Sequence, residues 1–292
     1  MTGLRCRQIE EADTDAVASL LTRGFPAHDR RFWLDAFAQL RRHQQPSGLP
    51  KYGYLLESNG AVVGAILLIC ATMRAGAGAG AGDEFDTRCN LSSWYVDPPF
   101  RAYAPMLVSQ ALRHKNVTYL NVSSAPHTRP IIEAQGFSRY SDGIFVAVPM
   151  LNGLFRGPKV EVFRADRDPS VAFDPFDRDV LVQHATHGCI SLWCATVERA
   201  YPFVFRRRLV KGAFPCAQLI YCRDVDDFVR FAGPLGRVLA RLGEPVVVID
   251  ANARIPGLFG FFSRGNMPKY FKGPRRPRLG DLAYTENAVL GV

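Results

Sequence analysis

The sequence has no apolar run long enough to cross a membrane, which needs about 20 predominantly apolar residues. Its longest apolar stretch, residues 61–71, is interrupted by Gly64 and is typical of a buried strand. The first residues, MTGLRCRQIEEADTD, also lack the apolar segment of a secretory signal. These absences predict a cytoplasmic protein with no membrane partner.

A disulfide framework and a standard zinc motif are missing as well. The seven cysteines are odd in number and scattered, so we expect buried or free thiols. One group, His184, His187, Cys189 and Cys194, has the spacing H-x2-H-x-C-x4-C, which fits no standard zinc pattern. Cys189 and Cys194 would also face opposite sides of one strand. We therefore expect no metal.

The net charge of +9 favours an acidic partner, whether a phosphate-bearing cofactor, nucleic acid or an anionic surface. Much of the excess lies in two groups: residues 206–208, and Lys269, Lys272, Arg275, Arg276 and Arg278. Neither group accompanies a recognisable nucleic-acid motif. We interpret both as solvated basic faces and do not expect nucleic acid as the partner.

Residues 91–143 have the most informative pattern in the chain. Residues 91–96 are rich in strand formers and stop at a Pro-Pro pair, and a short loop carrying Arg101 follows. Residues 104–114 have helical spacing of apolar side chains, and residues 117–122 are typical of a buried strand. Such a crossover unit points free backbone N–H groups at its loop, which suits a pyrophosphate.

The segments around this unit predict a regular order of elements. They are a strand at 5–9, helices at 10–23 and 31–43, and a hairpin of 52–57 with 61–71 across Asn59-Gly60. A mobile Ala/Gly loop at 74–82, a short helix at 130–134 and a turn at Gly136-Phe137 complete the order.

With this order of elements, residues 4–150 resemble a GNAT-family N-acyltransferase domain. Three stretches carry the resemblance: GYLLESNGAVVG at 53–64, VDPPFR at 96–101, and Gly136-Phe137. The resemblance implies an α/β fold with a mixed sheet and acetyl-CoA, or another acyl-coenzyme A, as co-substrate. It also implies transfer of the acyl group, which we expect to be acetyl, to an amine of a small molecule or protein.

The resemblance also implies which residues contact the cofactor. In the family, the loop after the arginine holds the pyrophosphate, and the splayed end of the preceding strand pairs with the pantetheine. The corresponding positions here are Tyr95, Val96, Arg101, Ala102, Tyr103 and Ala104. Arg101 would pair with phosphate, and the others would act through backbone groups.

Two departures from the family pattern weaken this prediction. The family has Gly-x-Gly-x-Gly/Ala after the arginine, whereas this chain has Ala102 and Ala104, whose Cβ atoms intrude on a phosphate. Pro105 removes one N–H donor. Where many members have a tyrosine that protonates the leaving thiolate, this chain has Ile132.

Three other titratable residues are candidates for catalysis, namely Tyr140, Glu57 and His127. Tyr140 is also explained as a strand aromatic that packs in the core, and the other two as surface residues. The catalytic residue therefore stays unassigned.

The second half repeats the first at an offset of about 129 residues, which relates Gly136 to Gly265. We expect a GNAT-like domain at 1–150, a connector at 151–178, and at 179–292 a truncated second copy with a C-terminal arm. This copy is predicted to lack both opening helices. Its helix at 224–242 is predicted to be interrupted near Pro234.

Asp250 and Asn252 lie at the carboxyl end of a central strand of the second half, where open α/β sheets place ligands. They are candidate substrate-binding residues, and the competing interpretation is loop capping. Two other functions stay open. One is a non-catalytic coenzyme A-binding or regulatory module, and the other is a tRNA-dependent aminoacyl transferase, which the basic charge would suit. Acceptor and oligomeric state stay unknown.

Overall fold

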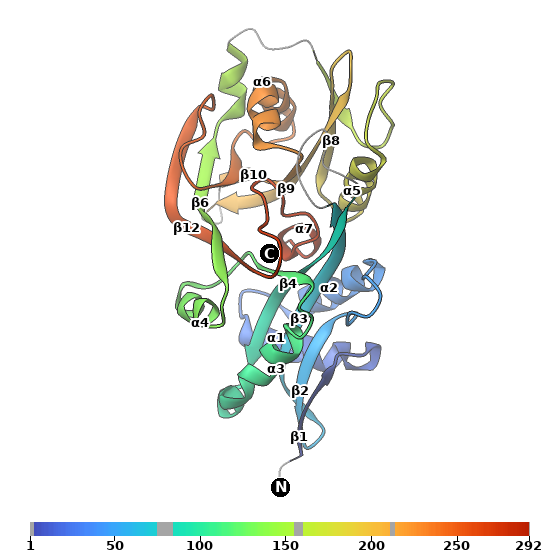
Figure 1. Cartoon of the computed structure of the whole chain (residues 1–292), viewed down its shortest axis with the longest axis vertical. Coiled ribbons are helices and arrows are strands. Elements are labelled where there is room, and N and C mark those ends of the chain that lie inside the picture. The colour runs from blue at the N-terminus through green and yellow to red at the C-terminus, as the bar shows by residue number, and fades with distance from the viewer. Residues whose placement is uncertain (1–2, 75–83, 155–159, 211–213, 292) are drawn as a thin grey trace.

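The structure, a computed structural model, describes residues 3–74, 84–154, 160–210 and 214–291 (Figure 1). The predicted Ala/Gly loop at 74–82 lies almost entirely outside the described residues. One sheet contains all the described strands: β1 Leu4–Gln8, β2 Gly53–Ser58, β3 Ala61–Arg74, β4 Phe85–Val96, β5 Val117–Asn121, β6 Ser138–Ala147, β7 Glu161–Arg164, β8 Ile190–Ala195, β9 Ala200–Val210, β10 Phe214–Cys222, β11 Val247–Ala251 and β12 Gly260–Lys272.

The described α-helices are α1 Thr14–Gly24, α2 Arg30–Arg42, α3 Ala104–Ala111, α4 Arg129–Ala134, α5 Pro175–Thr186, α6 Val225–Arg241 and α7 Glu286–Val289. Short 3-10 helices are η1 Glu11–Asp13, η2 Pro98–Tyr103, η3 Pro126–Thr128 and η4 Pro149–Leu154. No helix in the described part of the chain is long and apolar enough to cross a membrane.

The strand order is β1-β2-β3-β4-β5-β12-β6-β11-β10-β9-β8-β7, and it has the same form from either edge. The first half contributes five strands from one edge and the second half contributes five from the other. The two central strands are exchanged, because β12 separates β5 from β6 and β6 separates β12 from β11. Each half therefore completes its sheet with the sixth strand of the other half, as a duplicated fold allows.

Both faces of the first half are covered by helices. Leu55 and Leu67 pack with α1 and α2 on one face, while their neighbours Leu56 and Leu68 pack on the α3 face. Successive side chains of a strand point to opposite faces, so a strand buried on both faces is apolar throughout. This explains the continuous apolar run that became β3.

The predicted tight turn between β2 and β3 is confirmed. Ser58 pairs with Ala61, which leaves Asn59 and Gly60 as a two-residue loop. Both have left-handed φ angles, 50° and 80°. Asn and Gly are the residues that best tolerate this conformation, so the sequence fixes the register of the hairpin.

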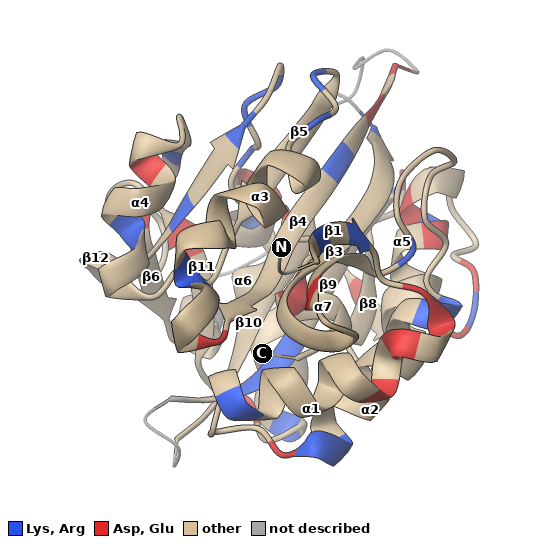
Figure 2. Cartoon of the chain, turned by 90° about the horizontal axis from the view of Figure 1, so that it is seen from below, with Lys and Arg blue, Asp and Glu red and all other residues tan. Residues whose placement is uncertain are grey.

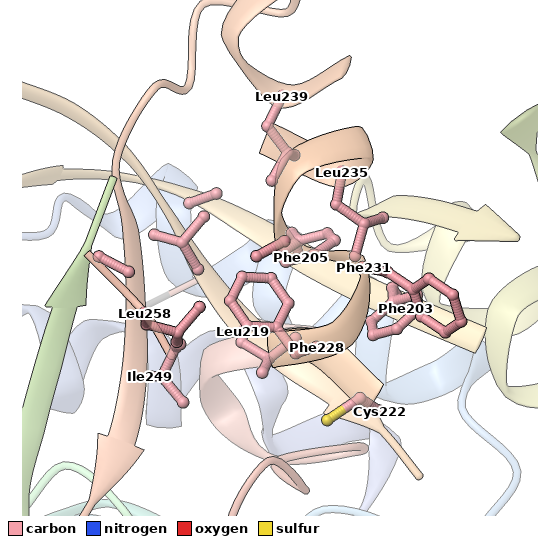
Figure 3. Packing of buried hydrophobic residues seen from close by; sticks show 14 of the residues in the cluster. Phe203, Phe205, Leu219, Cys222, Phe228, Phe231, Leu235, Leu239, Ile249 and Leu258 are labelled. Atoms are coloured by element: carbon pink, nitrogen blue, oxygen red, sulfur yellow. The ribbon is translucent and has the colours of Figure 1, made fainter. Parts of the chain in front are cut away.

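Helix α6 is continuous, so the predicted interruption near Pro234 is wrong. Proline in a helix costs about 3 kcal/mol, but α6 buries Phe228, Phe231, Leu235 and Leu239 on the sheet (Figure 3). Each such side chain contributes about 1.5–3 kcal/mol when buried. Burial therefore outweighs the local cost.

The second half is less truncated than predicted. Helix α5, which begins at Pro175 with Asp174 as its cap, stands between β7 and β8, so one of the two opening helices is present. Strand β7 pairs with β8, from Glu161 with Ala195 to Arg164 with Leu192. Strand β7 and the start of α5 lie within the predicted connector, and the boundaries at 150 and 178 stay predictions.

The C-terminal segment is the largest correction to the sequence-based view. We expected residues 273–292 to form a surface arm, but every residue from 280 to 290 is buried. Val289 and Leu290 pack with α1 and α2 of the first half, whereas Leu282 and Ala288 pack with strands of the second half. We call residues 280–290 the C-terminal segment below.

The basic groups are not simply solvated faces, so that interpretation is wrong in part. Lys269 is fully buried, with its Nζ 2.6 Å from Asp250. Arg208 donates to Gln218 at 2.5 Å, and Arg278 lies 3.3 Å from a carboxylate oxygen of Asp281. Figure 2 shows Lys and Arg interspersed with Asp and Glu around α1, α2 and α5 rather than gathered in one stripe.

Cys70 on β3 and Cys89 on β4 lie opposite each other and form a disulfide, which the sequence did not predict. The other five cysteines lie outside this disulfide. Cys189 and Cys194 pack in different clusters on opposite faces, as predicted. No group of three or more His, Cys, Asp or Glu residues placed to hold a metal is found among the described residues.

Candidate functional site

Strands β4 and β5 separate and form a wedge. They pair in parallel from Thr87 with Val117 to Asn90 with Leu120, after which β5 ends and β4 continues against β3 alone. Residues 91–95 of β4 therefore have no strand partner on the β5 side in the described part of the chain. Backbone groups on such an edge are ready to hydrogen-bond a ligand.

A β-bulge marks the start of the wedge. Ala65 pairs with Tyr95 and Leu67 with Ser92, so β4 has an extra residue relative to β3. Ser93, within the bulge, has a left-handed φ of 51°. A bulge of this kind bends the strand and re-aims its side chains, which turns β4 away from β5.

A cavity of about 440 Å³ occupies the wedge, within the range typical of small-molecule sites. Its walls come from β4, the segment after β5, α3, α4 and the end of α1. They include the side chains of Phe25, Ser92, Tyr95, Arg101, Ser123 and His127. This cavity is the candidate functional site.

The predicted cofactor contacts divide into two sets. Tyr95 and Arg101 line the cavity. The others do not line it in the described part of the chain: Val96, Ala102, Tyr103 and Ala104. Ala102 and Tyr103 are exposed, whereas Val96 is buried opposite Gly64 of β3.

The expected phosphate loop is a 3-10 turn that leads directly into α3. The N–H of Ala104 donates to the carbonyl of Arg101, and Pro105 has no N–H. Two of the backbone donors that a glycine-rich loop would offer are thus absent or used. Arg101, which is exposed, is the one Lys or Arg among the described residues that line the cavity.

Of the catalytic candidates, only His127 lines the cavity. Tyr140 is 2% exposed, and burial, with the nearby charge of Asp250, raises the pKa of its phenol well above the usual value. Glu57 accepts hydrogen bonds from Arg5 and Arg7 on the outer strands, at 2.9 Å each. Ile132 does line the cavity, so an apolar side chain stands there.

Asp250 and Asn252 are not among the described residues that line the cavity, and their contacts are with strands β6 and β12 instead. Asp250 is buried against Lys269, and burial raises the pKa of its carboxyl in spite of that cation. The side chain of Asn252 accepts from the N–H of Asp142 at 2.7 Å and donates to the carbonyl of Tyr140 at 3.1 Å. The contacts of Asn252 are those of a loop cap, whereas Asp250 forms a buried ion pair.

The structure adds one residue to the site that the sequence did not single out, Glu286 at the start of α7. It is 2% exposed, and its carboxylate accepts hydrogen bonds from Ser123 at 2.5 Å and from Ser92. Both serines line the cavity. Burial raises the pKa of Glu286, while hydrogen bonds from Ser123, Ser92 and Asn90 oppose that shift. In the sequence, the apolar residues around Glu286 were the signal that could have indicated its burial.

Two polar contacts fix the C-terminal segment beside this carboxylate. Asp281 lies 3.0 Å from Arg88 of β4, and both side chains are buried. The N–H of Tyr284 donates to Nε2 of His184 on α5, at 3.1 Å. Burial lowers the pKa of His184 to about 3, which keeps it neutral and able to accept.

The second half has an equivalent wedge, but the chain itself fills it. Strands β10 and β11 pair only from Ala217 with Val247 to Gln218 with Val248. Beyond that point the C-terminal segment pairs with β10. The N–H of Leu282 donates to the carbonyl of Ile220 at 2.7 Å, and the N–H of Cys222 donates to the carbonyl of Gly280 at 3.0 Å.

No protein-family profile matches the sequence, and no curated protein matches it. Solved structures do. A GCN5-related N-acetyltransferase from Kribbella flavida matches with a TM-score of 0.55 and 13% identity, over 92% of this chain and 71% of that chain. A putative acetyltransferase from Pyrococcus horikoshii matches at 0.52 and 14%, over 97% and 93%.

A probable N-acyltransferase from Enterococcus faecalis matches with a TM-score of 0.57 and 12% identity, over 97% of this chain and 74% of that chain. At these identities the likeness shows the fold alone. The chain therefore has a tandem GNAT-like fold of the α/β class, as predicted.

Proposed function

We propose that this protein transfers an acyl group, expected to be acetyl, from acyl-coenzyme A to an amine of a small molecule or protein. The observation that carries the proposal is the open wedge, in which residues 91–95 of β4, without a strand partner on the β5 side in the described part of the chain, border a cavity of about 440 Å³ within a tandem GNAT-like fold. The names of the similar structures, an N-acetyltransferase and a probable N-acyltransferase, agree with this activity.

The described residues fit such a co-substrate. The free edge of residues 91–95 suits the amide groups of a pantetheine arm, and Arg101 suits a phosphate. Bound acyl-coenzyme A would supply an activated thioester. The protein would hold the reacting groups together, exclude water with Phe25 and Ile132, and direct backbone N–H groups of β4 at developing negative charge.

The catalytic assignment narrows to the wall of the cavity. Of the three candidates from the sequence we retain His127, because Tyr140 is buried in the core and Glu57 is paired with Arg5 and Arg7. Ile132 cannot protonate a leaving thiolate. This favours the alternative of a coenzyme A-binding module without turnover, which the test below separates. The internal pairing of Lys269 and Arg278 weakens the case for tRNA.

Calorimetric titration with acetyl-CoA, followed by thiol release in the presence of an amine panel, tests the proposal. We expect binding, and release that depends on the amine. Arg101→Gln should weaken binding about tenfold, as expected for loss of one charged phosphate contact. Arg31→Gln is the matched control, since that arginine is exposed on α2. Binding without release would favour the non-catalytic module, and no binding would refute both.

A further inference from the structure

We propose that Glu286 is the final proton acceptor for the amine substrate, and that Ser123, which lines the cavity, relays the proton to it. This inference rests on the proposed acyl transfer and names the acceptor class, a primary amine that arrives as an ammonium ion. Glu286 acts through the serine, so its role is to accept and position the proton.

Glu286 is buried with no cation beside it among the residues that the structure describes. Five Asp and Glu side chains are buried in the described part of the chain. Four have a basic partner: Asp177 with Arg223, Glu244 with Arg207, Asp250 with Lys269, and Asp281 with Arg88. Glu286 has hydroxyl and amide donors instead. A buried carboxylate without a cation is costly, and such groups cluster at functional sites.

The two serines hold the carboxylate of Glu286 from opposite sides of the wedge. Ser92 stands at the bulge of β4, where the wedge opens, and Ser123 follows β5 on the opposite side. Both hydroxyls donate to Glu286, one to each carboxylate oxygen, and both side chains border the cavity. A hydroxyl that donates to a carboxylate keeps lone pairs free, and these can accept from an ammonium in the cavity.

The proton transfer balances without any further reactant. One N–H proton of the ammonium passes to Ser123 Oγ as the hydroxyl proton of Ser123 passes to Glu286. The neutral amine then has the lone pair that forms the new C–N bond. The C–S bond of the thioester breaks, and the nitrogen loses a second proton to the departing sulfur. Glu286 returns the first proton to solvent, so the reaction yields amide, thiol and one proton.

The charges around the cavity are compatible with this direction of transfer. The charged or titratable side chains that line it are Arg101, His127 and Tyr95. Burial is the largest influence on the pKa of Glu286 and raises it, which makes the carboxylate a better base than an exposed one. The carboxylate must be ionised to accept, so kcat/KM should rise with pH through a pKa above the usual carboxyl range.

The experiment uses the full chain with acetyl-CoA and methylamine, a primary amine small enough to need no specific acceptor contacts. We expect Glu286→Gln to lower kcat about 100-fold, a usual contribution of acid–base catalysis, and to remove the rising pH limb. Ser123→Ala should lower kcat about tenfold, since water can partly replace the relay. Affinity for acetyl-CoA, measured by calorimetry, should stay within twofold in each variant.

Two controls separate the relay from a structural role. Formate should restore part of the rate in Glu286→Ala, whose cavity admits it, but not in Glu286→Gln. Glu244→Gln, a buried glutamate outside the cavity, should keep the wild-type rate. Without substrate, infrared spectroscopy across pH should show a buried carboxyl band that Glu286→Gln lacks.

The remaining outcomes decide between two claims, the relay and the proposed function. Wild-type protein that binds acetyl-CoA but releases no thiol with methylamine, or Glu286→Gln that retains the rate and its pH limb, overturns the relay. So does a rate loss in Glu286→Gln that only parallels a loss of folded protein. Absence of acetyl-CoA binding by the wild type instead refutes the proposed function itself.

Discussion

The wedge between β4 and β5 holds a cavity, whereas the equivalent wedge between β10 and β11 is filled by residues 280–282. The covering helices differ too, because α3 spans 8 residues and α6 spans 17. The second half thus has the same arrangement of strands, but its own backbone occupies the place where the first half has a cavity. From there the chain continues to the first wedge and places Glu286 beneath it. The C-terminal segment of the second half therefore contributes a buried residue to the site of the first half.

The largest effect on stability should come from loosening residues 280–282, which fill the wedge between β10 and β11. Asp281→Ala would leave Arg88 buried without its partner, and loss of one member of a buried ion pair costs about 3–5 kcal/mol. Although burial raises it, the charges of Arg88 and Arg278 hold the pKa of Asp281 below its usual value. Urea denaturation measures the loss, with exposed Asp166→Ala as control. Equal stabilities of the wild type and Asp281→Ala would show that this ion pair does not hold residues 280–282 in place.

Acid should loosen the same segment. Burial lowers the pKa of His184 to about 3 and of His187 to about 4, while unfolded histidines titrate near 6.5. The unfolded chain therefore binds protons first, so stability is full above 6.5 and falls as pH decreases towards 4. Each histidine should cost about 2 kcal/mol between pH 7 and pH 5.

Denaturation at both pH values tests this expectation. His184→Gln should reduce the slope, because glutamine does not titrate. His114→Gln serves as the control, since His114 lies outside the cluster of His43, His184 and His187 around Tyr284. An unchanged slope in His184→Gln would remove His184 from the explanation.

The open wedge should be sensitive to one methyl group. A Cβ at Gly24 would lie 2.3 Å from Cγ of Tyr95, so Gly24→Ala should push that ring within the cavity. Alanine favours a helix over glycine by about 1 kcal/mol, which limits the stability loss. We expect acetyl-CoA affinity to fall about tenfold, or about 1.4 kcal/mol. Gly3→Ala, with open space around it, should leave calorimetric affinity unchanged.

The smallest effect concerns the altered phosphate loop. Ala102→Gly removes a Cβ next to Arg101 and should strengthen acetyl-CoA binding by about 0.5 kcal/mol, with a stability loss of about 0.5–1 kcal/mol. Calorimetry and thermal unfolding measure the two terms. The same change at exposed Ala253 should affect stability alone. Weaker binding in Ala102→Gly would mean that this loop does not face the phosphates.

Local patterns allowed much of the fold to be predicted. The Asn59-Gly60 turn, the apolar run of β3 and the amphipathic helix α2 follow from neighbouring residues. The strand exchange does not, because the pairing of Tyr270 with Asn121 joins residues far apart in the sequence. Only the offset of the repeat hinted at two copies.

The site was predicted in part for the same reason. Tyr95, Arg101 and His127 lie near the wedge in sequence, and the structure places them on the cavity. Glu286 comes from a segment more than 100 residues away and has no motif around it. Asp250 resembled a ligand-binding residue because it lies at the end of a strand, but its partner Lys269 lies on β12, which no local pattern places near β11.

The exchanged central strands also constrain how the chain reaches its native state. Strand β12 is made after β11 yet must be placed between β5 and β6, which precede it by more than 100 residues. During synthesis, the edges of β5 and β6 must therefore wait unpaired until β12 emerges. Such non-local pairing slows folding and exposes strand edges to aggregation. Protein quality control should thus act on the first half for as long as the second is incomplete.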